Sequence, residues 1–329
     1  MTSQITPETI NVVVVKKALI AEDIYLYELR HESPGTPLPA FEAGAHIDVY
    51  AGDFVRQYSL CGMPGAADSY QIAVLREPSS RGGSHYMHDR VAEGARLRVG
   101  RPRNLFPLHA ADTVSADHTV LLAGGIGITP LLSMAESLHQ RGASFELHYY
   151  TRSLGRTAFK ERLASCPFKD RVRFHHDDAP ATRVDLQTLL RGADRLAHLY
   201  FCGPAGFISA VQDTSAGLQW EPARVHFERF AADPRPDADS DAAFTVRIGG
   251  AGRQIAVPAG TAITAALSEA GIDIPVSCEQ GVCGTCLTGV LEGEVDHRDQ
   301  YLTEEERDRN DQMTPCCSRA KGPLLVLDL

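Results

Sequence analysis

The sequence predicts a multidomain chain of mixed α/β and β architecture, with an antiparallel β-barrel, a doubly wound parallel α/β domain and a C-terminal β-grasp domain. Three observations predict this fold. Residues 5–108 consist of short β-branched runs punctuated by glycine and proline, which is typical of a small barrel. Apolar strands then alternate with helical stretches, as in a doubly wound sheet. Four cysteines near the C-terminus stand in the spacing of a plant-type [2Fe–2S] cluster.

The predicted barrel contains two polar motifs that suit a bound ring system and a phosphate. Its first strands are expected at Thr9 to Lys17, Ile24 to Leu29 and Ala45 to Val49. In Arg56-Gln57-Tyr58-Ser59, an arginine beside an aromatic ring and a hydroxyl can hold a planar, hydrogen-bonding ring system. In Arg81-Gly82-Gly83-Ser84, backbone N–H groups and a bidentate arginine can cradle a phosphate. Each motif alone is a weak signal, because an Arg-x-Tyr-Ser stretch is more often an ordinary strand.

The predicted α/β domain begins with a buried strand at Thr119 to Ala123, which is a continuous apolar run. This strand leads into the glycine turn Gly124-Gly125-Ile126-Gly127-Ile128-Thr129-Pro130 and then a helix from Leu131 to about Gln140. A strand followed by a glycine turn and a helix lets a pyrophosphate approach the helix N-terminus. The glycine spacing differs from Gly-x-Gly-x-x-Gly, so this is not the usual Rossmann fingerprint.

The rest of this domain alternates strands with helices. Strands are expected at 145–150, 171–175 and 196–201, and helices at 157–165 and 185–191. The last strand ends at Cys202-Gly203-Pro204, where a doubly wound sheet binds its ligands. His175-His176-Asp177-Asp178 has a metal-like composition, but it follows a strand directly and is interpreted as a solvated loop.

The cysteine motif of the third domain is the most specific signal in the chain. Four residues separate Cys278 from Cys283, and two separate Cys283 from Cys286. A further twenty-nine residues separate Cys286 from Cys316, which completes the ligand spacing of a plant-type [2Fe–2S] cluster. Zinc is the main competitor, but zinc sites usually pair two short C-x-x-C knuckles, and Cys316 has no such partner.

The residues around these cysteines agree with a β-grasp domain. Gly281 and Gly284 permit the sharp backbone bend that three ligands from one loop require. Cys317 adjoins Cys316, but the spacing favours Cys316 as the fourth ligand, and Cys317 is interpreted as a small buried apolar residue. A hairpin is expected from Phe244 to Ile248 and Gln254 to Val257, a helix at 262–271 and another helix start after Thr303.

Composition and charge exclude several classes of protein. The net charge of −10 argues against nucleic-acid binding, which needs a basic surface. No apolar run approaches the length of a membrane span and no secretory signal is visible, so a cytoplasmic protein without a membrane segment is expected. Residues 242–329 hold thirteen acidic and seven basic residues. This excess suits either steering toward a basic partner or simple solubility, and the sequence leaves both open.

Taken together, the motifs resemble those of the phthalate dioxygenase reductase family, which includes the vanillate O-demethylase reductases. Arg56-Gln57-Tyr58-Ser59, the glycine turn at 124–130, Cys202-Gly203-Pro204 and the C-terminal cysteines occur in the same order in that family. Gly100 to Phe106 and Phe227-Glu228-Arg229-Phe230 also look like family segments. The resemblance therefore spans essentially the whole chain.

With this resemblance the chain divides into an FMN-binding β-barrel domain at 1–112, an NAD-binding α/β domain at 113–230, a linker at 231–241 and a [2Fe–2S] ferredoxin domain at 242–329. The resemblance implies FMN rather than FAD. The implied cofactor-binding residues are Arg56, Gln57, Tyr58, Ser59, Arg81, Gly82, Gly83, Ser84, Gly124, Gly125, Gly127, Thr129, Pro130, Cys202, Gly203, Pro204 and Phe230, and the metal ligands are Cys278, Cys283, Cys286 and Cys316.

The implied activity is an NADH-dependent oxidoreductase that splits a two-electron hydride into single electrons. Nicotinamide delivers a hydride while the cluster accepts one electron at a time, so a flavin must convert between them. As the catalytic pair, Ser59 is expected near flavin N5 and Cys202 beside the nicotinamide. Arg152 and Ser153 stand where an NAD enzyme would carry an acidic residue, so NADPH stays open, although the family favours NADH.

The resemblance also implies a protein partner. This chain lacks the C-x-H and C-x-x-H pair of a Rieske centre, so the acceptor would be a separate Rieske non-haem iron oxygenase that hydroxylates or demethylates an aromatic acid. The chain itself is expected to be a monomer. Two alternatives stay open: a reductase for a cytochrome P450 or another acceptor, and a non-catalytic iron–sulfur protein that senses redox state. The second alternative predicts a cluster without flavin and without turnover of NADH.

Overall fold

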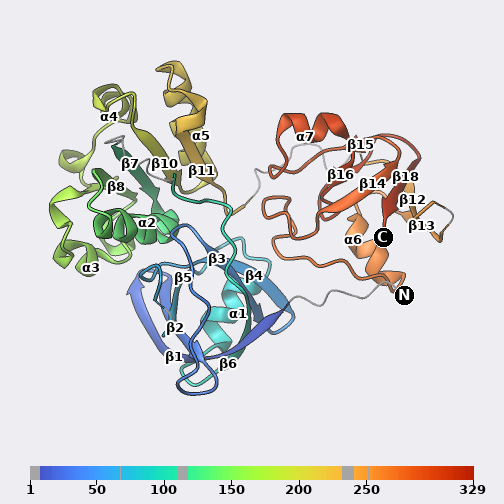
Figure 1. The fold of residues 1–329 in the computed structure, drawn as a ribbon, viewed down its shortest axis with the longest axis horizontal. Helices are drawn as coiled ribbons and strands as arrows, with labels where there is room; N and C mark the ends of the chain where they lie inside the picture. The colour runs from blue at the N-terminus through green and yellow to red at the C-terminus, as the bar shows by residue number, and fades with distance from the viewer. Residues whose placement is uncertain (1–7, 67, 110–117, 232–240, 251) are drawn as a thin grey trace. The chain divides into compact units, whose positions relative to one another are not determined.

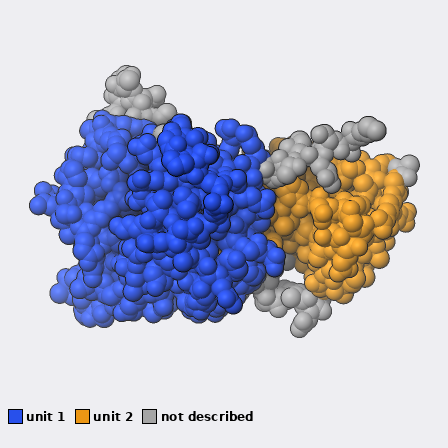
Figure 2. Space-filling model, turned by 90° about the horizontal axis from the view of Figure 1, so that it is seen from below, with its two compact units in different colours: residues 1–229 blue, residues 230–329 orange. Residues whose placement is uncertain are grey.

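The computed structural model describes residues 8–66, 68–109, 118–231, 241–250 and 252–329. The chain divides into two compact units, residues 1–229 and residues 230–329 (Figure 2). The predicted boundary between residues 112 and 113, and nearly all of the predicted linker at 231–241, lie outside the described residues. The predicted domain boundaries therefore stay predictions.

The first sheet of unit 1 is an antiparallel barrel of six strands in the order β4-β3-β6-β1-β2-β5 (Figure 1). A bridge between Leu60, which follows β4, and Ile72 on β5 joins the two edge strands and closes it. Alternate side chains fill the interior because successive residues of a strand point to opposite faces. The elements are β1 (Thr9–Ala21), β2 (Ile24–His31), β3 (His46–Ala51), β4 (Phe54–Ser59), β5 (Tyr70–Leu75), α1 (Gly83–Arg90) and β6 (Arg96–Gly100). The predicted antiparallel barrel is confirmed.

The second sheet of unit 1 is fully parallel, in the order β11-β10-β7-β8-β9 (Figure 1). On its central strand β7, Leu121 packs into the core that contains α2 and α3, while Val120 and Leu122 pack into the core that contains α4 and α5. Helices thus cover both faces, as a doubly wound fold requires. The elements are β7 (Thr119–Gly124), α2 (Ile128–Gln140), β8 (Phe145–Thr151), α3 (Lys160–Ser165), β9 (Val172–His176), α4 (Leu186–Gly192), β10 (His198–Cys202), α5 (Ala205–Gly217) and β11 (Val225–Glu228).

The interpretation of residues 175–178 as a solvated loop is wrong for both histidines. His175 and His176 end β9 and are buried, because the strand continues in register beside β8. His175 Nε2 lies 2.9 Å from His148 Nδ1, and His176 Nδ1 lies 2.9 Å from Thr151 Oγ1. Only the two aspartates occupy an exposed turn.

Unit 2 is a mixed β-sheet with two short helices, in the strand order β13-β12-β18-β14-β16. Strands β12 and β18 are parallel and the other pairs are antiparallel. The side chain of Thr303 and that of Glu306 cap α7 reciprocally, as the predicted helix start requires. The elements are β12 (Phe244–Ile248), β13 (Gln254–Val257), α6 (Ile263–Glu269), β14 (Thr288–Glu292), β15 (Val295–Asp296), α7 (Glu304–Arg309), β16 (Gln312–Met313), β17 (Arg319–Ala320) and β18 (Leu324–Asp328).

Among the described residues, no helix is both long enough and apolar enough to cross a membrane.

Candidate functional site

The barrel brings together the two motifs that the sequence predicts for a ring system and a phosphate. Arg56 lies on β4, and its guanidinium donates to the carbonyl of Arg81 at 3.5 Å. Gly83 begins α1, and a Cβ there would lie 2.6 Å from Arg56 Cγ. Gly82 has φ +94°, and a Cβ there would lie 2.5 Å from the ring of Phe54. Both glycines are therefore required for this close approach.

Strand β4 presents its predicted site residues on two faces, since side chains alternate along a strand. Gln57 Nε2 lies 3.4 Å from His46 Nε2. Ser84 Oγ, in the first turn of α1, contacts Ser80 Oγ at 2.9 Å and accepts the N–H of Glu77. Burial raises the pKa of Tyr58 well above its usual range, so its phenol stays neutral.

The glycine turn after β7 lies against the end of β10. Residues Gly125–Gly127 form one 3-10 turn and α2 begins at Ile128, three residues earlier than predicted. A Cβ on Gly127 would lie 2.2 Å from the carbonyl oxygen of Cys202, and one on Gly203 would lie 3.0 Å from Gly124 Cα. The two motifs therefore meet backbone to backbone. Pro130 falls in the first turn of α2, where its missing N–H breaks no helical bond.

Thr129 is also in the first turn of α2, and its hydroxyl donates to the carbonyl of Ile126 at 3.1 Å. Gly125 has φ +53°, and a Cβ there would meet no atom within 4 Å. The backbone at this turn is therefore open on one side. A pyrophosphate requires this kind of access to the N–H groups of a helix N-terminus.

A buried carboxylate links the barrel to the parallel sheet. Glu228 ends β11 directly beside Cys202 at the end of β10. Burial raises the pKa of this carboxyl to about 8, against a smaller opposing effect of the nearby hydroxyl of Ser59. The residue as a whole is partly exposed, but its Oε2 is enclosed and has no hydrogen-bond partner among the described residues. Ser59, Cys202 and Glu228 thus form one site.

Cys202 is fully buried, and burial together with the neighbouring Glu228 raises the pKa of its thiol. Glu228 is a candidate site residue that the motif analysis did not single out, although the segment Phe227-Glu228-Arg229-Phe230 contained it. The only signal that the sequence offered for this residue was an acidic side chain at the end of a short strand. Phe230 is 40% exposed and is the first residue of unit 2, so its predicted place near the flavin stays a prediction.

The cysteine loop of unit 2 depends on its two glycines. The thiols of Cys278, Cys283 and Cys286 are buried, and the loop between them turns at Gly281 (φ +73°) and Gly284 (φ +66°). A Cβ on Gly281 would lie 2.4 Å from Cys317 Sγ, and one on Gly284 would lie 2.3 Å from the ring of Tyr301. Any other residue at these positions would displace its neighbours.

The thiols fit an iron–sulfur cluster in their chemistry and their surroundings. Among the described residues, no three His, Cys, Asp or Glu side chains are gathered as the shell of one metal ion. The thiols instead interact in pairs, Cys278 with Cys283 and Cys316 with both Cys278 and Cys286. Backbone N–H groups also point at two sulfurs, from Gln280 to Cys278 Sγ at 3.4 Å and from Thr285 to Cys283 Sγ at 3.5 Å. Soft thiolates with N–H donors suit an iron–sulfur cluster.

The structure also distinguishes the two adjacent cysteines. Cys316 interacts with two of the other predicted ligands. The thiol of Cys317 contacts the hydroxyl of Thr314 at 3.3 Å and lies against Gly281. This arrangement favours Cys316 as the fourth ligand, in agreement with the spacing.

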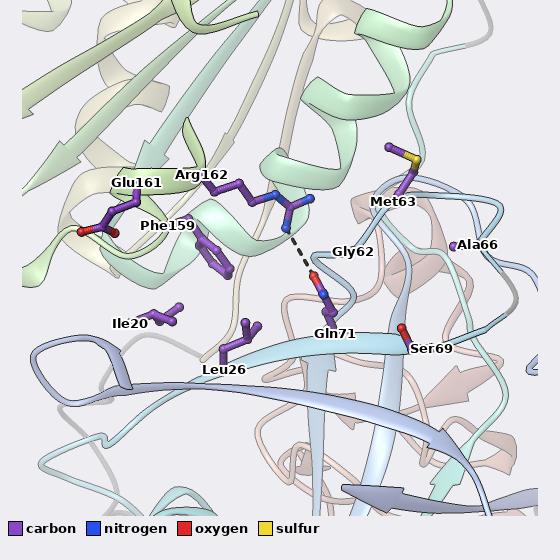
Figure 3. Close-up of a pocket in the computed structure, with 10 residues that line it drawn as sticks. All are labelled: Ile20, Leu26, Gly62, Met63, Ala66, Ser69, Gln71, Phe159, Glu161 and Arg162. Atoms are coloured by element: carbon purple, nitrogen blue, oxygen red, sulfur yellow. Dashed lines mark hydrogen bonds between the residues drawn. The ribbon is translucent and has the colours of Figure 1, made fainter. Parts of the chain in front are cut away.

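A separate cavity of about 470 Å³ lies in unit 1 (Figure 3). None of the predicted site residues lines it. Arg162 on α3 reaches its wall and donates to the carbonyl of Cys61 at 3.1 Å, to Gln71 Oε1 at 3.3 Å and to Glu136 Oε1 at 3.1 Å. Arg162 thereby joins α2 and α3 to the barrel segment that follows Ser59. The lining residues are Ile20, Leu26, Gly62, Met63, Ala66, Ser69, Gln71, Phe159, Glu161 and Arg162.

Comparison with known proteins gives matches over the whole chain. A family model described as a 2Fe-2S iron-sulfur cluster binding domain matches residues 246–321. The chain is 48% identical over 322 residues to a vanillate O-demethylase oxidoreductase of Pseudomonas sp. (strain HR199 / DSM 7063), covering 97% of this chain and 100% of that protein.

Two solved structures are also similar over 98% of the chain. Phthalate dioxygenase reductase matches with a TM-score of 0.76 and 39% identity, over 98% of its own length. An intact type IV self-sufficient cytochrome P450 monooxygenase matches with a TM-score of 0.82 and 40% identity, and the present chain corresponds to 41% of that longer chain.

Proposed function

This chain belongs to the family of phthalate dioxygenase reductases and vanillate O-demethylase oxidoreductases, and we propose from that premise that it passes electrons from NADH through FMN and a [2Fe–2S] cluster to a separate oxygenase. It is an oxidoreductase, and two further relatives are reductase subunits of monooxygenases. The acceptor that we propose is a Rieske non-haem iron oxygenase that hydroxylates or O-demethylates an aromatic acid. We propose that the protein acts as a cytoplasmic monomer.

The observation that carries this proposal is the buried site formed by Ser59, Cys202 and Glu228. Ser59 comes from the barrel, while Cys202 and Glu228 come from adjacent parallel strands. Hydride transfer needs donor and acceptor rings held face to face where water is excluded. A bound flavin takes up the hydride and gives up its electrons one at a time, which is the chemistry it supplies here.

The side chains of this site would place the two rings and stay uncharged. With its pKa raised to about 8, Glu228 keeps its proton at neutral pH and lies beside the hydroxyl of Ser59, which bonds to the flavin in our proposal. The raised pKa of Cys202 keeps its thiol neutral, so it presents a small apolar surface to the nicotinamide. NADH delivers its hydrogen as a hydride, so the task of these residues is ring placement and not proton delivery.

We assign the phosphates to two helix N-termini. Arg81, Gly82 and the start of α1 would hold the FMN phosphate, and the turn that opens α2 would hold the NADH pyrophosphate. Exposed Arg152 follows β8 and can contact the adenosine end of either coenzyme. NADH is the proposed donor, with NADPH as the alternative that a direct comparison must exclude.

The cluster ligands that we propose are Cys278, Cys283, Cys286 and Cys316. An assembled [2Fe–2S] cluster carries one electron at a time, which it supplies to the acceptor protein. A second candidate acceptor is a cytochrome P450, because the chain matches 41% of a self-sufficient P450 monooxygenase with a TM-score of 0.82.

Two experiments test this function. Flavin released by heat from the purified protein should be FMN, at one per chain, and FAD would contradict the assignment. The reductase is then combined with the purified oxygenase component of a vanillate O-demethylase and, in parallel, with a P450 that accepts electrons from [2Fe–2S] proteins. Product formed only with the oxygenase supports the first acceptor, and product formed only with the P450 supports the second.

The site itself is tested by Ser59→Ala. We expect this variant to lower the rate of flavin reduction by NADH roughly 10²-fold, because a hydrogen bond that orients the flavin for hydride transfer is lost. The chemically reduced cluster should keep its EPR spectrum, which serves as the internal control. Flavin reduction at the wild-type rate would remove Ser59 from the proposed site.

A further inference from the structure

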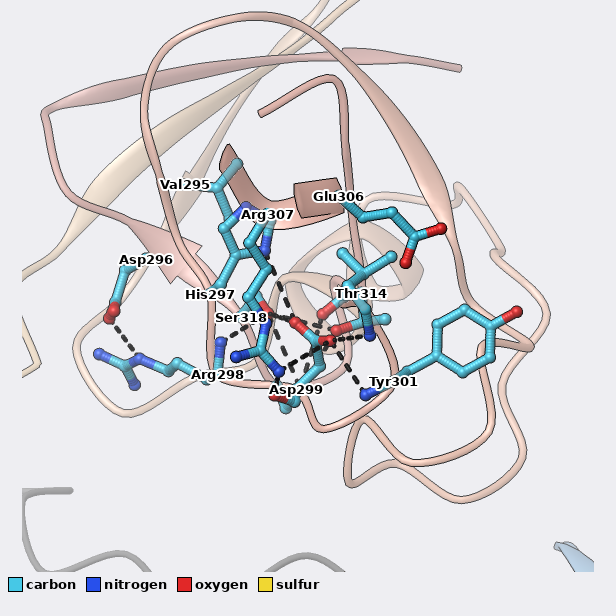
Figure 4. Close-up of polar contacts among 12 residues, drawn as sticks. Val295, Asp296, His297, Arg298, Asp299, Tyr301, Glu306, Arg307, Thr314 and Ser318 are labelled. Carbon is cyan, nitrogen blue, oxygen red and sulfur yellow. Dashed lines mark hydrogen bonds and ion pairs between the residues drawn. The ribbon is translucent and has the colours of Figure 1, made fainter. Parts of the chain in front are cut away.

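Asp299 lies in unit 2 on the segment after β15, and its side chain is completely buried (Figure 4). Its Oδ2 accepts the backbone N–H of Tyr301 at 3.1 Å and of Leu302 at 2.7 Å. Its Oδ1 accepts the hydroxyl of Ser318 at 3.5 Å. An aspartate that binds the N–H groups two and three residues ahead closes a tight turn. The carboxylate therefore fixes the path of residues 299–302.

Charged and polar neighbours hold this carboxylate in place. Arg307 on α7 donates to the backbone carbonyl of Asp299 at 2.6 Å, and its guanidinium lies 3.9 Å from Oδ2. His297 Nδ1 lies 3.6 Å from Oδ1. A buried charge is costly unless it is hydrogen-bonded and paired, so this arrangement indicates that the position of Asp299 is closely specified.

The turn that Asp299 closes lies directly on the cysteine loop. The N–H of Gln300 donates to the carbonyl of Gly281 at 2.9 Å. A Cβ on Gly281 would lie 2.8 Å from Asp299 Cα, and the ring of Tyr301 occupies the space beside Gly284. Residues 299–301 thus cover both glycines that flank Cys283.

We propose that Asp299 is a positioning residue for the cysteine loop, and that it lowers the reduction potential of the cluster bound there. It does so in two ways. Its turn keeps residues 299–301 over Gly281 and Gly284, which limits access of water, and its buried negative charge opposes the addition of an electron. Solvent exposure and nearby charge are among the factors that set the potential of such clusters. This inference rests on the proposed function only through the cluster ligands, not through the flavin or the acceptor.

The test is Asp299→Asn in the full-length protein loaded with its cluster. The amide has nearly the same shape but lacks the charge, so the reduced cluster should be favoured about tenfold, which is about 59 mV for a one-electron couple. The potential is measured by redox titration of the cluster EPR signal. Asp308→Asn is the matched control, because Asp308 is exposed on α7 and the change in charge is the same. The control should leave the potential unchanged.

Tyr301→Ala provides an independent variant that keeps the carboxylate and removes only the cover over Gly284. It should also raise the potential, by less than Asp299→Asn. If Asp299→Asn cannot be loaded with a cluster, the reduction potential of Tyr301→Ala alone tests the proposal. Wild-type potentials and EPR spectra in the cluster-loaded variants would overturn the proposal. A wild-type protein without a [2Fe–2S] signal would instead refute the proposed ligands, so the two failures are distinguishable.

Discussion

Replacement of the buried Glu228 by glutamine should remove a pH dependence from the stability of unit 1. Burial raises the pKa of this carboxyl from 4.5 to about 8. The folded state therefore keeps a proton that the unfolded state releases once the pH exceeds 4.5. The contribution of Glu228 to the free energy of unfolding therefore falls as pH rises toward 8 and then levels off, and Glu228→Gln lacks this contribution.

The magnitude follows from the two pKa values. Each pH unit between them changes the contribution of Glu228 to the free energy of unfolding by about 1.36 kcal/mol. Allowing for partial ionisation at each end, the stability of Glu228→Gln relative to wild type should increase by about 3 kcal/mol between pH 5.5 and pH 8.0. The lost carboxylate contacts add an offset, but that offset is the same at both pH values.

Urea unfolding at the two pH values measures this difference. Trp220, the single tryptophan, is buried in the parallel-sheet domain, so its fluorescence reports the unfolding of unit 1. The matched control is Glu161→Gln, because Glu161 has a side chain that is 78% exposed. Its unfolding free energy should follow that of the wild type. If the unfolding free energies of wild type and Glu228→Gln changed in parallel with pH, the assignment of a proton to Glu228 would be refuted.

Four further substitutions test the cluster ligands, the glycine turn and the ion pair of Arg162. Cys316→Ser should abolish the [2Fe–2S] visible and EPR signals, whereas Cys317→Ser should retain them, because Cys316 lies beside Cys278 and Cys286 while the thiol of Cys317 contacts the hydroxyl of Thr314. Gly127→Ala places a Cβ 2.2 Å from the carbonyl oxygen of Cys202, so stopped-flow flavin reduction by NADH should slow roughly 10²-fold. Arg162→Ala leaves a buried carboxylate on α2 without its cation and should lower the urea unfolding free energy by about 2 kcal/mol.

Each of these expectations can fail in a distinct way. Cluster signals that survive Cys316→Ser and vanish in Cys317→Ser would exchange the two assignments. Wild-type flavin reduction in Gly127→Ala would show that the turn does not lie at the nucleotide. Arg162→Lys keeps the charge but not the forked geometry, so it should lose less stability than Arg162→Ala, and equal losses would contradict a role for the ion pair.

Local patterns in the sequence predicted the architecture well. Strands β12 and β13 have the predicted bounds, because their alternation is bounded by glycine and proline. The cysteine spacing led to the domain that the family model matches. The predicted start of α2 was three residues late, since the sequence does not reveal that the glycine turn is a single 3-10 turn or that Pro130 stands inside the helix.

Contacts between distant segments could not be predicted in the same way. Glu228 becomes functional only because β11 pairs with β10 and places it beside Cys202 and near Ser59. Asp299 looks like an ordinary polar residue until its turn is seen to cover Gly281. The buried histidines at the end of β9 likewise depend on the pairing with β8. The period of the hydrophobic pattern and the spacing of motifs carry no information about which distant strands and turns lie side by side.

The electron path from NADH through flavin to the cluster is the central claim, and an anaerobic absorption titration of the purified protein with NADH tests it most directly. A parallel titration with NADPH settles the choice of coenzyme. Stepwise bleaching of both the flavin and the cluster bands as NADH is added is the predicted result, with about 1.5 equivalents needed in full because FMN takes two electrons and the cluster one. A cluster spectrum without flavin bands that neither coenzyme bleaches, even after FMN is added, would contradict the reductase and leave a redox-sensing iron–sulfur protein.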